Sequence, residues 1–364
     1  MAELDVFDKP VALSEAWRVP KDGAVRRYFG TPANAAITLL CMIALFLIGK
    51  VAFAWLFVDA VWSGGPEACK IGEGACWPFF GDKLRFMLFG YFPYDEHWRP
   101  LSALLLFVGM CGLSMVPRMW SARLLLLWVA ALVVCYLVMT GGFAGMTAVP
   151  TTKWGGLPLS FMLSFVGLTC AFPLGILLAL GRTSNLPAIR VISIVFIEFM
   201  RGVPLISVLF MASVMLPLFM PGGMSVATLL RAQVAVILFA AAYVAETVRG
   251  GLQSLPSGQF EAAQAMGLHY WLMMRLVILP QAIKAMIPAL VSTCINFFQD
   301  TTLVTIIGLL DFLTTVRGAM RDPNWQGIAV LEGYLFAAAV YCLFSAIMSA
   351  YSRFLERRFR AGHD

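Results

Sequence analysis

The sequence predicts an all-α polytopic membrane protein with about eight transmembrane helices, and three observations support this. Of the 364 residues, 60% are hydrophobic and only 13% are charged, whereas a soluble protein has roughly 25% charged residues. The apolar residues form long runs, which is typical of helices that have lipid as their solvent. Within the runs polar and apolar residues do not alternate, so helices are expected rather than β-barrel strands.

Eight apolar runs are candidates for these helices, because a span needs about 20 mostly apolar residues. In chain order they cover residues 35–58, 99–116, 123–140, 157–180, 191–216, 228–248, 283–303 and 327–351. The second and third runs are short. Pro173, Pro204 and Pro288 fall inside three later runs, and we expect each proline to break its helix because it removes a backbone hydrogen bond.

The charge distribution predicts how the chain is oriented and divided. With the N-terminus in the cytoplasm, sixteen of the 26 lysine and arginine residues lie on the cytoplasmic side and eight on the other side, as the positive-inside rule requires. Both termini are therefore expected in the cytoplasm. The expected parts are a cytoplasmic tail (1–34), a three-helix extension (35–150) with an outer loop (59–98), a five-helix core (151–355) with a cytoplasmic loop (249–284), and a cytoplasmic tail (356–364).

The cytoplasmic loop contains the most informative pattern in the chain. It reads Glu261-Ala262-Ala263, three residues, Gly267, nine residues, Val277, one residue, and Leu279-Pro280. Good helix formers followed by a glycine predict a short helix that ends near Gly267, which by itself could be a simple connector. The pattern resembles the EAA loop of binding-protein-dependent ABC importers, with Val277 in place of the usual isoleucine. This resemblance implies that the helix couples the chain to a separate ATP-binding subunit through Glu261, Ala262, Ala263, Gly267, Leu279 and Pro280.

Three further motifs narrow the resemblance. Glu198-x-x-Arg201-Gly-x-Pro204 is similar to a motif of polar amino-acid permeases of the histidine/glutamine type. The stretch 242–251 resembles the lead-in to the EAA loop in that family, and Asp300-Thr301-Thr302-Leu303 resembles its Asp-Thr-Ser-Leu. The match covers about residues 155–360. Together with the three-helix extension, it makes the chain look most like the M subunit of general L-amino-acid transporters.

The resemblance implies a five-helix type I ABC importer core and a non-catalytic permease subunit in a bacterial inner membrane. Such a subunit moves L-amino acids from the periplasm to the cytoplasm by alternating access. Its implied partners are a dimer of ATP-binding cassette subunits that binds ATP and Mg²⁺, a second permease subunit and a periplasmic solute-binding protein. A heterodimer of permeases is favoured over a homodimer. Which amino acids are carried does not follow from the resemblance.

Charged and polar residues within the spans are candidates for the substrate path. A charge inside a span costs about 2.5–3.5 kcal/mol, so it is usually paired or faces water. Glu198 and Arg201 are spaced to pair on one helix face. They form either a salt bridge that fixes a kink before Pro204 or a cavity-lining pair that contacts a zwitterionic substrate. A second polar group lies near the outer end of the seventh span, where it either grips the substrate or joins helices, and consists of Asn296, Gln299, Asp300 and Thr301.

The remaining patterns bear on other sites and other functions. Cys69 and Cys76 lie in the outer loop, and we expect a disulfide there because disulfides persist outside the cytoplasm. The three histidines lie far apart, without metal-ligand spacing, and no Gly-x-x-x-x-Gly-Lys-Ser/Thr motif occurs. No metal, cofactor or nucleic-acid partner is therefore expected for this chain. The alternative function is a stand-alone secondary transporter or channel for small polar solutes, which inverted repeats would favour, but none is visible.

Overall fold

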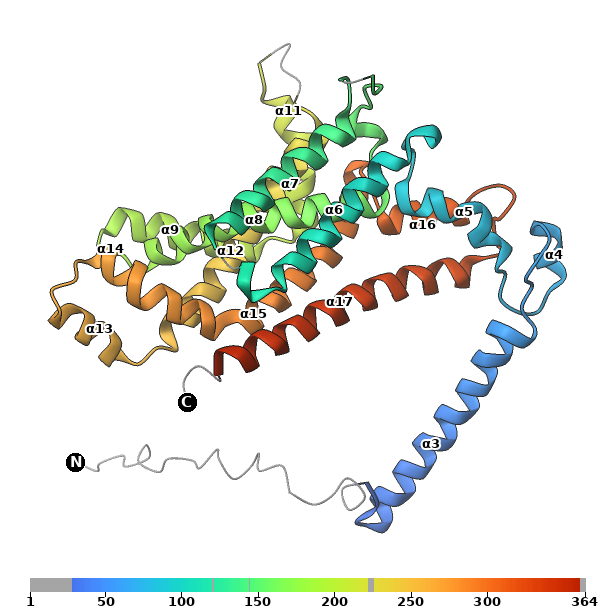
Figure 1. Ribbon diagram of the computed structural model, residues 1–364, viewed down its shortest axis with the longest axis horizontal. Coiled ribbons are helices and arrows are strands. Elements are labelled where there is room, and N and C mark those ends of the chain that lie inside the picture. The colour runs from blue at the N-terminus through green and yellow to red at the C-terminus, as the bar shows by residue number, and fades with distance from the viewer. Residues whose placement is uncertain (1–27, 120, 144, 222–225, 361–364) are drawn as a thin grey trace, which may run out of the picture.

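The computed structural model describes residues 28–119, 121–143, 145–221 and 226–360. Most of the expected N-terminal tail and the end of the expected C-terminal tail therefore fall outside the described residues. The described chain is a bundle of helices with a single two-residue strand (Figure 1). One end of the bundle carries α13 (Ser257–Ala265) and α14 (Tyr270–Met273), and the other carries α5 (Pro78–Phe89) and α16 (Phe312–Met320).

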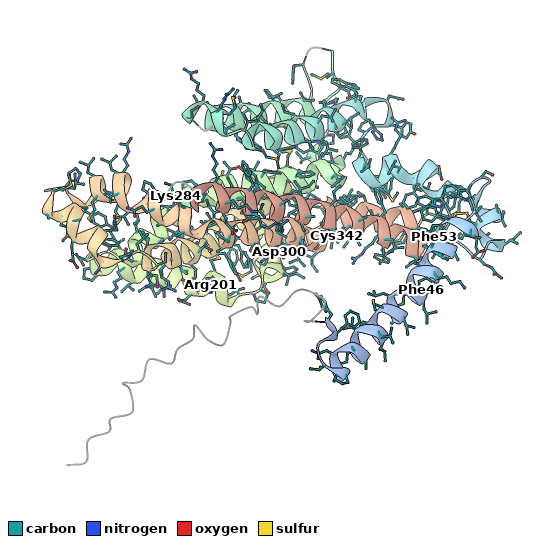
Figure 2. The ribbon with its side chains drawn as sticks, turned by 60° about the horizontal axis from the view of Figure 1, so that its bottom comes forward. Phe46, Phe53, Arg201, Lys284, Asp300 and Cys342 are labelled. Atoms are coloured by element: carbon teal, nitrogen blue, oxygen red, sulfur yellow. A yellow bond between two sulfur atoms is a disulfide. The ribbon has the colours of Figure 1, made fainter. Side chains whose placement is uncertain are left out.

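The first apolar run forms α3 (Pro32–Phe53), which continues as one π-helical turn, Ala54–Val58. Thr31 caps the N-terminus by accepting a hydrogen bond from the Asn34 amide at 3.2 Å, and proline occupies the first helical position, where its missing N–H costs nothing. None of the residues of α3 is buried, and the helix stands apart from the bundle, with Phe46 and Phe53 on its surface (Figures 1 and 2). Its apolar surface is suited to lipid.

The outer loop, residues 59–98, is not an irregular loop. It contains α4 (Pro66–Ile71) and α5 (Pro78–Phe89), and Cys69 and Cys76 are joined by a disulfide with a Cα–Cα distance of 5.6 Å. The Cys76 amide donates a hydrogen bond of 2.8 Å to the buried carboxylate of Glu332. The outer loop is thus attached to the start of the last helix, α17 (Val330–Arg360).

The two short apolar runs form the helices α6 (Trp98–Ser114) and α7 (Ala122–Thr140). Arg99, which is completely buried, binds the C-terminal end of α7. Its guanidinium donates to the carbonyl oxygens of Val138 at 2.7 Å, Met139 at 2.9 Å and Thr147 at 3.0 Å, and it forms an ion pair with Glu96. These bonds satisfy carbonyls that the helix end leaves without partners.

Four long helices make up the centre of the bundle: α8 (Gly156–Arg182), α12 (Thr228–Gln253), α15 (Leu279–Asp300) and α17. The backbones of α8 and α12 approach closely at Gly167 and Gly175, where an added Cβ would lie 2.9 Å from Val236 and 2.6 Å from Val244. Small residues at membrane helix interfaces permit such close approach. The pair α8–α12 is therefore the rigid part of the bundle.

Only one of the three prolines breaks its helix, which corrects the expectation for the other two. Helix α8 continues through Pro173 and α15 through Pro288, because neighbouring helices can compensate for a lost backbone bond inside a membrane bundle. At Pro204 the chain does bend, by 103°, between α9 (Pro187–Gly202) and the segment Leu205–Leu218. That segment comprises α10 (Leu205–Phe210), a π-helical turn (Met211–Met215) and α11 (Leu216–Leu218).

After α15 the chain does not leave the bundle directly. It forms a 3-10 segment (Thr301–Ile307), the strand β1 (Leu310–Asp311) and then α16. Strand β1 pairs with Gly155 and Gly156 just before α8. On the opposite end, α13, α14 and a π-helical turn (Met274–Ile278) connect α12 to α15.

By length and hydropathy, five helices in the described part of the chain can cross a membrane, and the bent pair α9–α11 would be a sixth. The helices α6 and α7, with 17 and 19 residues, are not among them. The fold is thus an all-α polytopic membrane protein.

Candidate functional site

A cavity of about 560 Å³ lies between three helices in the middle of the bundle. We call it the polar cavity. It is lined by the break between α9 and α10, by Phe239 and Tyr243 of α12, and by the last two turns of α15. The structure brings four of the six predicted path residues together there: Arg201, Asn296, Gln299 and Asp300.

Arg201 reaches the polar cavity from the C-terminal end of α9, one residue before the helix stops at Gly202. Its guanidinium lies 5.8 Å from the ring centre of Tyr243 and 3.6 Å from the Glu246 carboxylate. Within the described residues its side chain donates no hydrogen bond, and 34% of it is exposed. The donors of Arg201 are therefore available to another carboxylate.

Asp300 ends α15 on the other side of the cavity, and Figure 2 labels it and Arg201 on different helices of the bundle. It is partly buried and forms neither an ion pair nor a side-chain hydrogen bond with any described residue. Asn296 and Gln299 are exposed on the same helix, and the Gln299 amide lies 3.4 Å from the Ser345 hydroxyl of α17. One cavity is thus lined by an arginine that keeps unused hydrogen-bond donors beside its ion pair with Glu246 and by a carboxylate without a partner among the described residues.

The other two predicted residues lie elsewhere. Glu198 does not pair with Arg201, which corrects the expected i, i+3 salt bridge. It accepts a hydrogen bond of 2.9 Å from Arg182 at the end of α8 and does not line the polar cavity. Thr301 is buried and donates to the Phe298 carbonyl at 2.7 Å, so its hydroxyl stabilises the end of α15.

A charged network next to the cavity was not predicted as a site. Glu246 of α12 is held by Arg249 through two contacts of 3.0 Å, and Arg182 and Arg201 each lie 3.6 Å from it. With Glu198 the network has three arginines and two glutamates, a net charge of one positive unit. The sequence pattern that could have indicated this network is Glu246-x-x-Arg249, which places opposite charges at i, i+3 within an apolar run.

The predicted coupling motif forms α13 and the turn that follows it. The Gly267 amide donates to the Gln264 carbonyl at 2.8 Å and the Leu268 amide to the Ala263 carbonyl at 3.2 Å, which is the Schellman arrangement that ends a helix. Gly267 has the positive φ of 76° that this turn requires.

Most of the coupling motif faces outward. Ala263 is buried against the bundle, whereas Glu261, Ala262 and Gly267 are exposed and Met266 is 80% exposed. Leu279 and Pro280 begin α15, and next to them the Gln281 amide donates to Gln259 of α13 at 3.0 Å. The exposed side of α13 is therefore held in a fixed position relative to α15.

Several known proteins have similar sequences. Residues 171–361 match the family of binding-protein-dependent transport system inner membrane components. The inner membrane amino-acid ABC transporter permease protein YhdY of Escherichia coli K12 is 46% identical over 93% of this chain and 92% of its own length. The glutamate/glutamine/aspartate/asparagine transport system permease protein BztC of Rhodobacter capsulatus is 35% identical over 92% of each chain.

A solved structure is also similar. One chain in a crystal structure of an amino acid ABC transporter with histidines is 30% identical, with a TM-score of 0.50 over 56% of this chain and 92% of that one. The family match covers more than half of the sequence, and relatives of nearly the same extent exceed 30% identity. The chain therefore belongs to the family of binding-protein-dependent transport system inner membrane components, and it is a multi-pass inner membrane protein.

Proposed function

We propose that this protein is the permease subunit of an ATP-driven importer of L-amino acids and that the polar cavity is its binding site during transport. The observation that carries this proposal is a pair of opposite charges on the walls of one cavity: Asp300, which has no partner among the described residues, and Arg201, whose ion pair with Glu246 leaves hydrogen-bond donors unused. A charge inside a membrane bundle is costly unless it is paired or faces water, and where one occurs it usually marks a functional site. An amino acid has a carboxylate and an ammonium group, which match these two side chains.

Each wall offers chemistry suited to one end of the substrate. The guanidinium of Arg201 can bind a carboxylate through two parallel hydrogen bonds, and the carboxylate of Asp300 accepts from an ammonium group. Asn296 adds an amide on the same wall. The cavity volume of about 560 Å³ lies within the usual range for small-molecule sites, about 300–1,000 Å³. The names of YhdY and BztC, which refer to amino acids, support the same cargo.

The exposed surfaces of the chain support an ATP-binding subunit and a second permease subunit as its partners. We assign α13 to the contact with a separate ATP-binding subunit, which binds ATP and Mg²⁺, because most of its residues are exposed. In this assignment α13, α14 and the end of α17 face the cytoplasm, both termini are cytoplasmic, and residues 59–98 face the periplasm. Asn296 and Gln299 are exposed, and a second permease subunit would cover them; we favour a related but different chain. Residues 151–355 form the permease core and 35–150 the extension.

The test is uptake by the complex reconstituted in liposomes with purified Arg201→Gln and Asp300→Asn variants. Loss of a hydrogen bond to a charged group costs about 1.5–3 kcal/mol, so the maximal uptake rate should fall about tenfold or more. Arg190→Gln is the matched control, because it removes an exposed charge from the same helix outside both the cavity and the charged network. Co-purification of the ATP-binding subunit checks that the complex is intact. Uptake that stays at the wild-type rate in both cavity variants would contradict the proposed site.

A further inference from the structure

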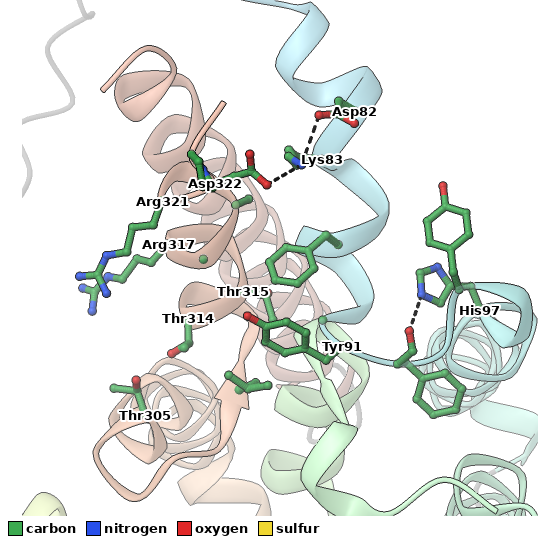
Figure 3. Close-up of a pocket in the computed structure, with 18 residues that line it drawn as sticks. Asp82, Lys83, Tyr91, His97, Thr305, Thr314, Thr315, Arg317, Arg321 and Asp322 are labelled. Carbon is green, nitrogen blue, oxygen red and sulfur yellow. Dashed lines mark hydrogen bonds and ion pairs between the residues drawn. The ribbon is translucent and has the colours of Figure 1, made fainter. Parts of the chain in front are cut away.

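A second, larger cavity of about 870 Å³ lies at the end of the bundle opposite to α13. We call it the outer cavity. Its walls come from two parts of the chain that are far apart in the sequence: the outer loop, from α5 to His97, and the core, from Thr305 to Pro323 (Figure 3). Neither part encloses the cavity alone, so this feature exists only because the extension packs on the core.

Three polar contacts hold the two walls in place. Lys83 of α5 lies 2.9 Å from the Asp322 carboxylate, and Asp82 accepts a hydrogen bond of 2.7 Å from the indole of Trp325. The buried hydroxyl of Thr315 in α16 donates to the Met87 carbonyl at 2.6 Å. Figure 3 shows Lys83 between Asp82 and Asp322. These contacts join the two walls of the outer cavity, and Lys83 offsets one of the two carboxylate charges of Asp82 and Asp322.

The wall from the extension carries two exposed tyrosines that are fixed in position. Tyr91 is 60% exposed and Tyr94 is 62% exposed. The ring of Phe86 packs edge-on against Tyr91 with 5.1 Å between centroids, and the guanidinium of Arg85 lies 3.8 Å above the ring of Tyr94. Tyrosine is enriched at protein–protein interfaces, and a ring that is already immobilised loses little conformational entropy when a partner binds.

The wall from the core carries two arginines that lack partners. Arg317 and Arg321 are one turn apart on and just after α16, and their side chains project to the same side (Figure 3). Among the residues that the structure describes, neither side chain donates a hydrogen bond or forms an ion pair, and the buried Nε of Arg317 has no acceptor. The nearby Asp322 is engaged by Lys83. This wall thus presents two positive charges that form no ion pair with any described residue, and the charged side chains that line the outer cavity sum to one positive unit.

We propose that the outer cavity is the docking site of the solute-binding protein and that the N-terminal extension serves to complete it. The family of this chain depends on such a binding protein, and docked tyrosines and arginines contribute most of the energy in many interfaces. Acidic side chains of the binding protein contact Arg317 and Arg321, and an apolar part of its surface covers Tyr91. This inference rests on the proposed orientation, in which residues 59–98 face the periplasm, but it does not depend on which solute is carried.

The test is direct binding of the purified solute-binding protein that supports uptake to the complex in lipid nanodiscs. Arg317→Gln combined with Arg321→Gln should weaken binding about tenfold, since each charge pair at an interface rim contributes up to a few-fold, and should reduce the dependence of the association rate on salt. Tyr91→Ala should weaken binding by a similar factor. Lys153→Gln, which removes an exposed cation outside the cavity, is the matched control and should bind like wild type.

Several outcomes would overturn the proposal. Unchanged affinity in both the double arginine variant and Tyr91→Ala would mean that the binding protein docks elsewhere. Weaker binding in the arginine variant alone would limit docking to the core and leave the extension without this role. Unchanged affinity with a slower maximal uptake rate would show that the arginines act on the free amino acid as it enters. Because binding is measured without transport, failure of the amino-acid assignment would leave this result unaffected.

Discussion

Gly267 offers the most quantitative test of the coupling helix. Its φ of 76° lies in the left-handed region, and its amide and that of Leu268 make the two hydrogen bonds that close the end of α13. A Cβ added at Gly267 would meet no atom within 4 Å, so steric clash contributes nothing. The remaining cost is the backbone penalty of a non-glycine residue in this conformation, about 1–2 kcal/mol. This corresponds to roughly a 5- to 30-fold loss in the population of the intact turn.

The size of that penalty depends on the side chain, which allows a matched pair of variants. A β-branched valine tolerates the left-handed region poorly, whereas asparagine adopts it several-fold more often than other residues. Gly267→Val should therefore weaken association of the ATP-binding subunit by about 5- to 30-fold, and Gly267→Asn should have only a small effect. The measurement is titration of the ATP-binding subunit against the purified permease, with membrane insertion followed by the amount of protein extracted.

Two results would contradict the role of the left-handed turn at Gly267. If Gly267→Val and Gly267→Asn bind the ATP-binding subunit equally well, the left-handed turn does not position the contact. If both lose binding to the same extent, any side chain at this position obstructs the partner, and the argument from backbone strain fails.

Three further predictions concern the extension. Arg99→Met should lower the free energy of unfolding of the α6–α7 hairpin by about 3 kcal/mol or more, because three carbonyls lose their donor, at about 1 kcal/mol or more each, and the partly buried Glu96 loses its ion-pair partner; thermal unfolding beside the exposed control Lys70→Met measures this, and equal stabilities would contradict it. Mass spectrometry of the unreduced, denatured protein should find Cys69 and Cys76 protected from alkylation while free Cys135 reacts; modification of all three cysteines would rule out the disulfide. Burial lowers the pKa of His97 from its ordinary value, despite its bond of 2.9 Å to the Phe92 carbonyl. The unfolded chain therefore takes up the proton first, and the stability of the fold should decrease as the pH drops below about 6.5. His97→Gln should flatten this dependence between pH 7.5 and 5, and an unchanged slope would contradict the assignment to His97.

Patterns within short stretches of the sequence predicted those elements whose formation depends on neighbouring residues alone. The apolar runs predicted the long helices, and the residues around Gly267 predicted a helix that ends there, because composition and one glycine are sufficient for both. Pro173 and Pro204 show where such reasoning fails. Both remove the same backbone donor, but the outcome depends on whether neighbouring helices compensate, and the sequence does not reveal which helices are neighbours.

The candidate site was predictable only in part for the same reason. Arg201 and the polar end of α15 were recognisable because charge within an apolar run is rare. The actual partners of Glu198 and Arg201 are Arg182 and Glu246, which come from other helices. The walls of the outer cavity are held together by the bond between Thr315 and Met87, which are more than 200 positions apart. Pairings of this kind depend on tertiary packing, which periodicity does not encode.

We propose that this chain imports amino acids only as part of an ATP-driven complex. The most direct measurement is uptake of labelled L-amino acids into liposomes that contain the permease, its ATP-binding subunit and the solute-binding protein outside. Uptake should require enclosed ATP and the binding protein, and it should persist when a protonophore dissipates the ion gradient. Uptake by the permease alone, driven by an ion gradient and independent of ATP, would contradict it and would favour a stand-alone transporter.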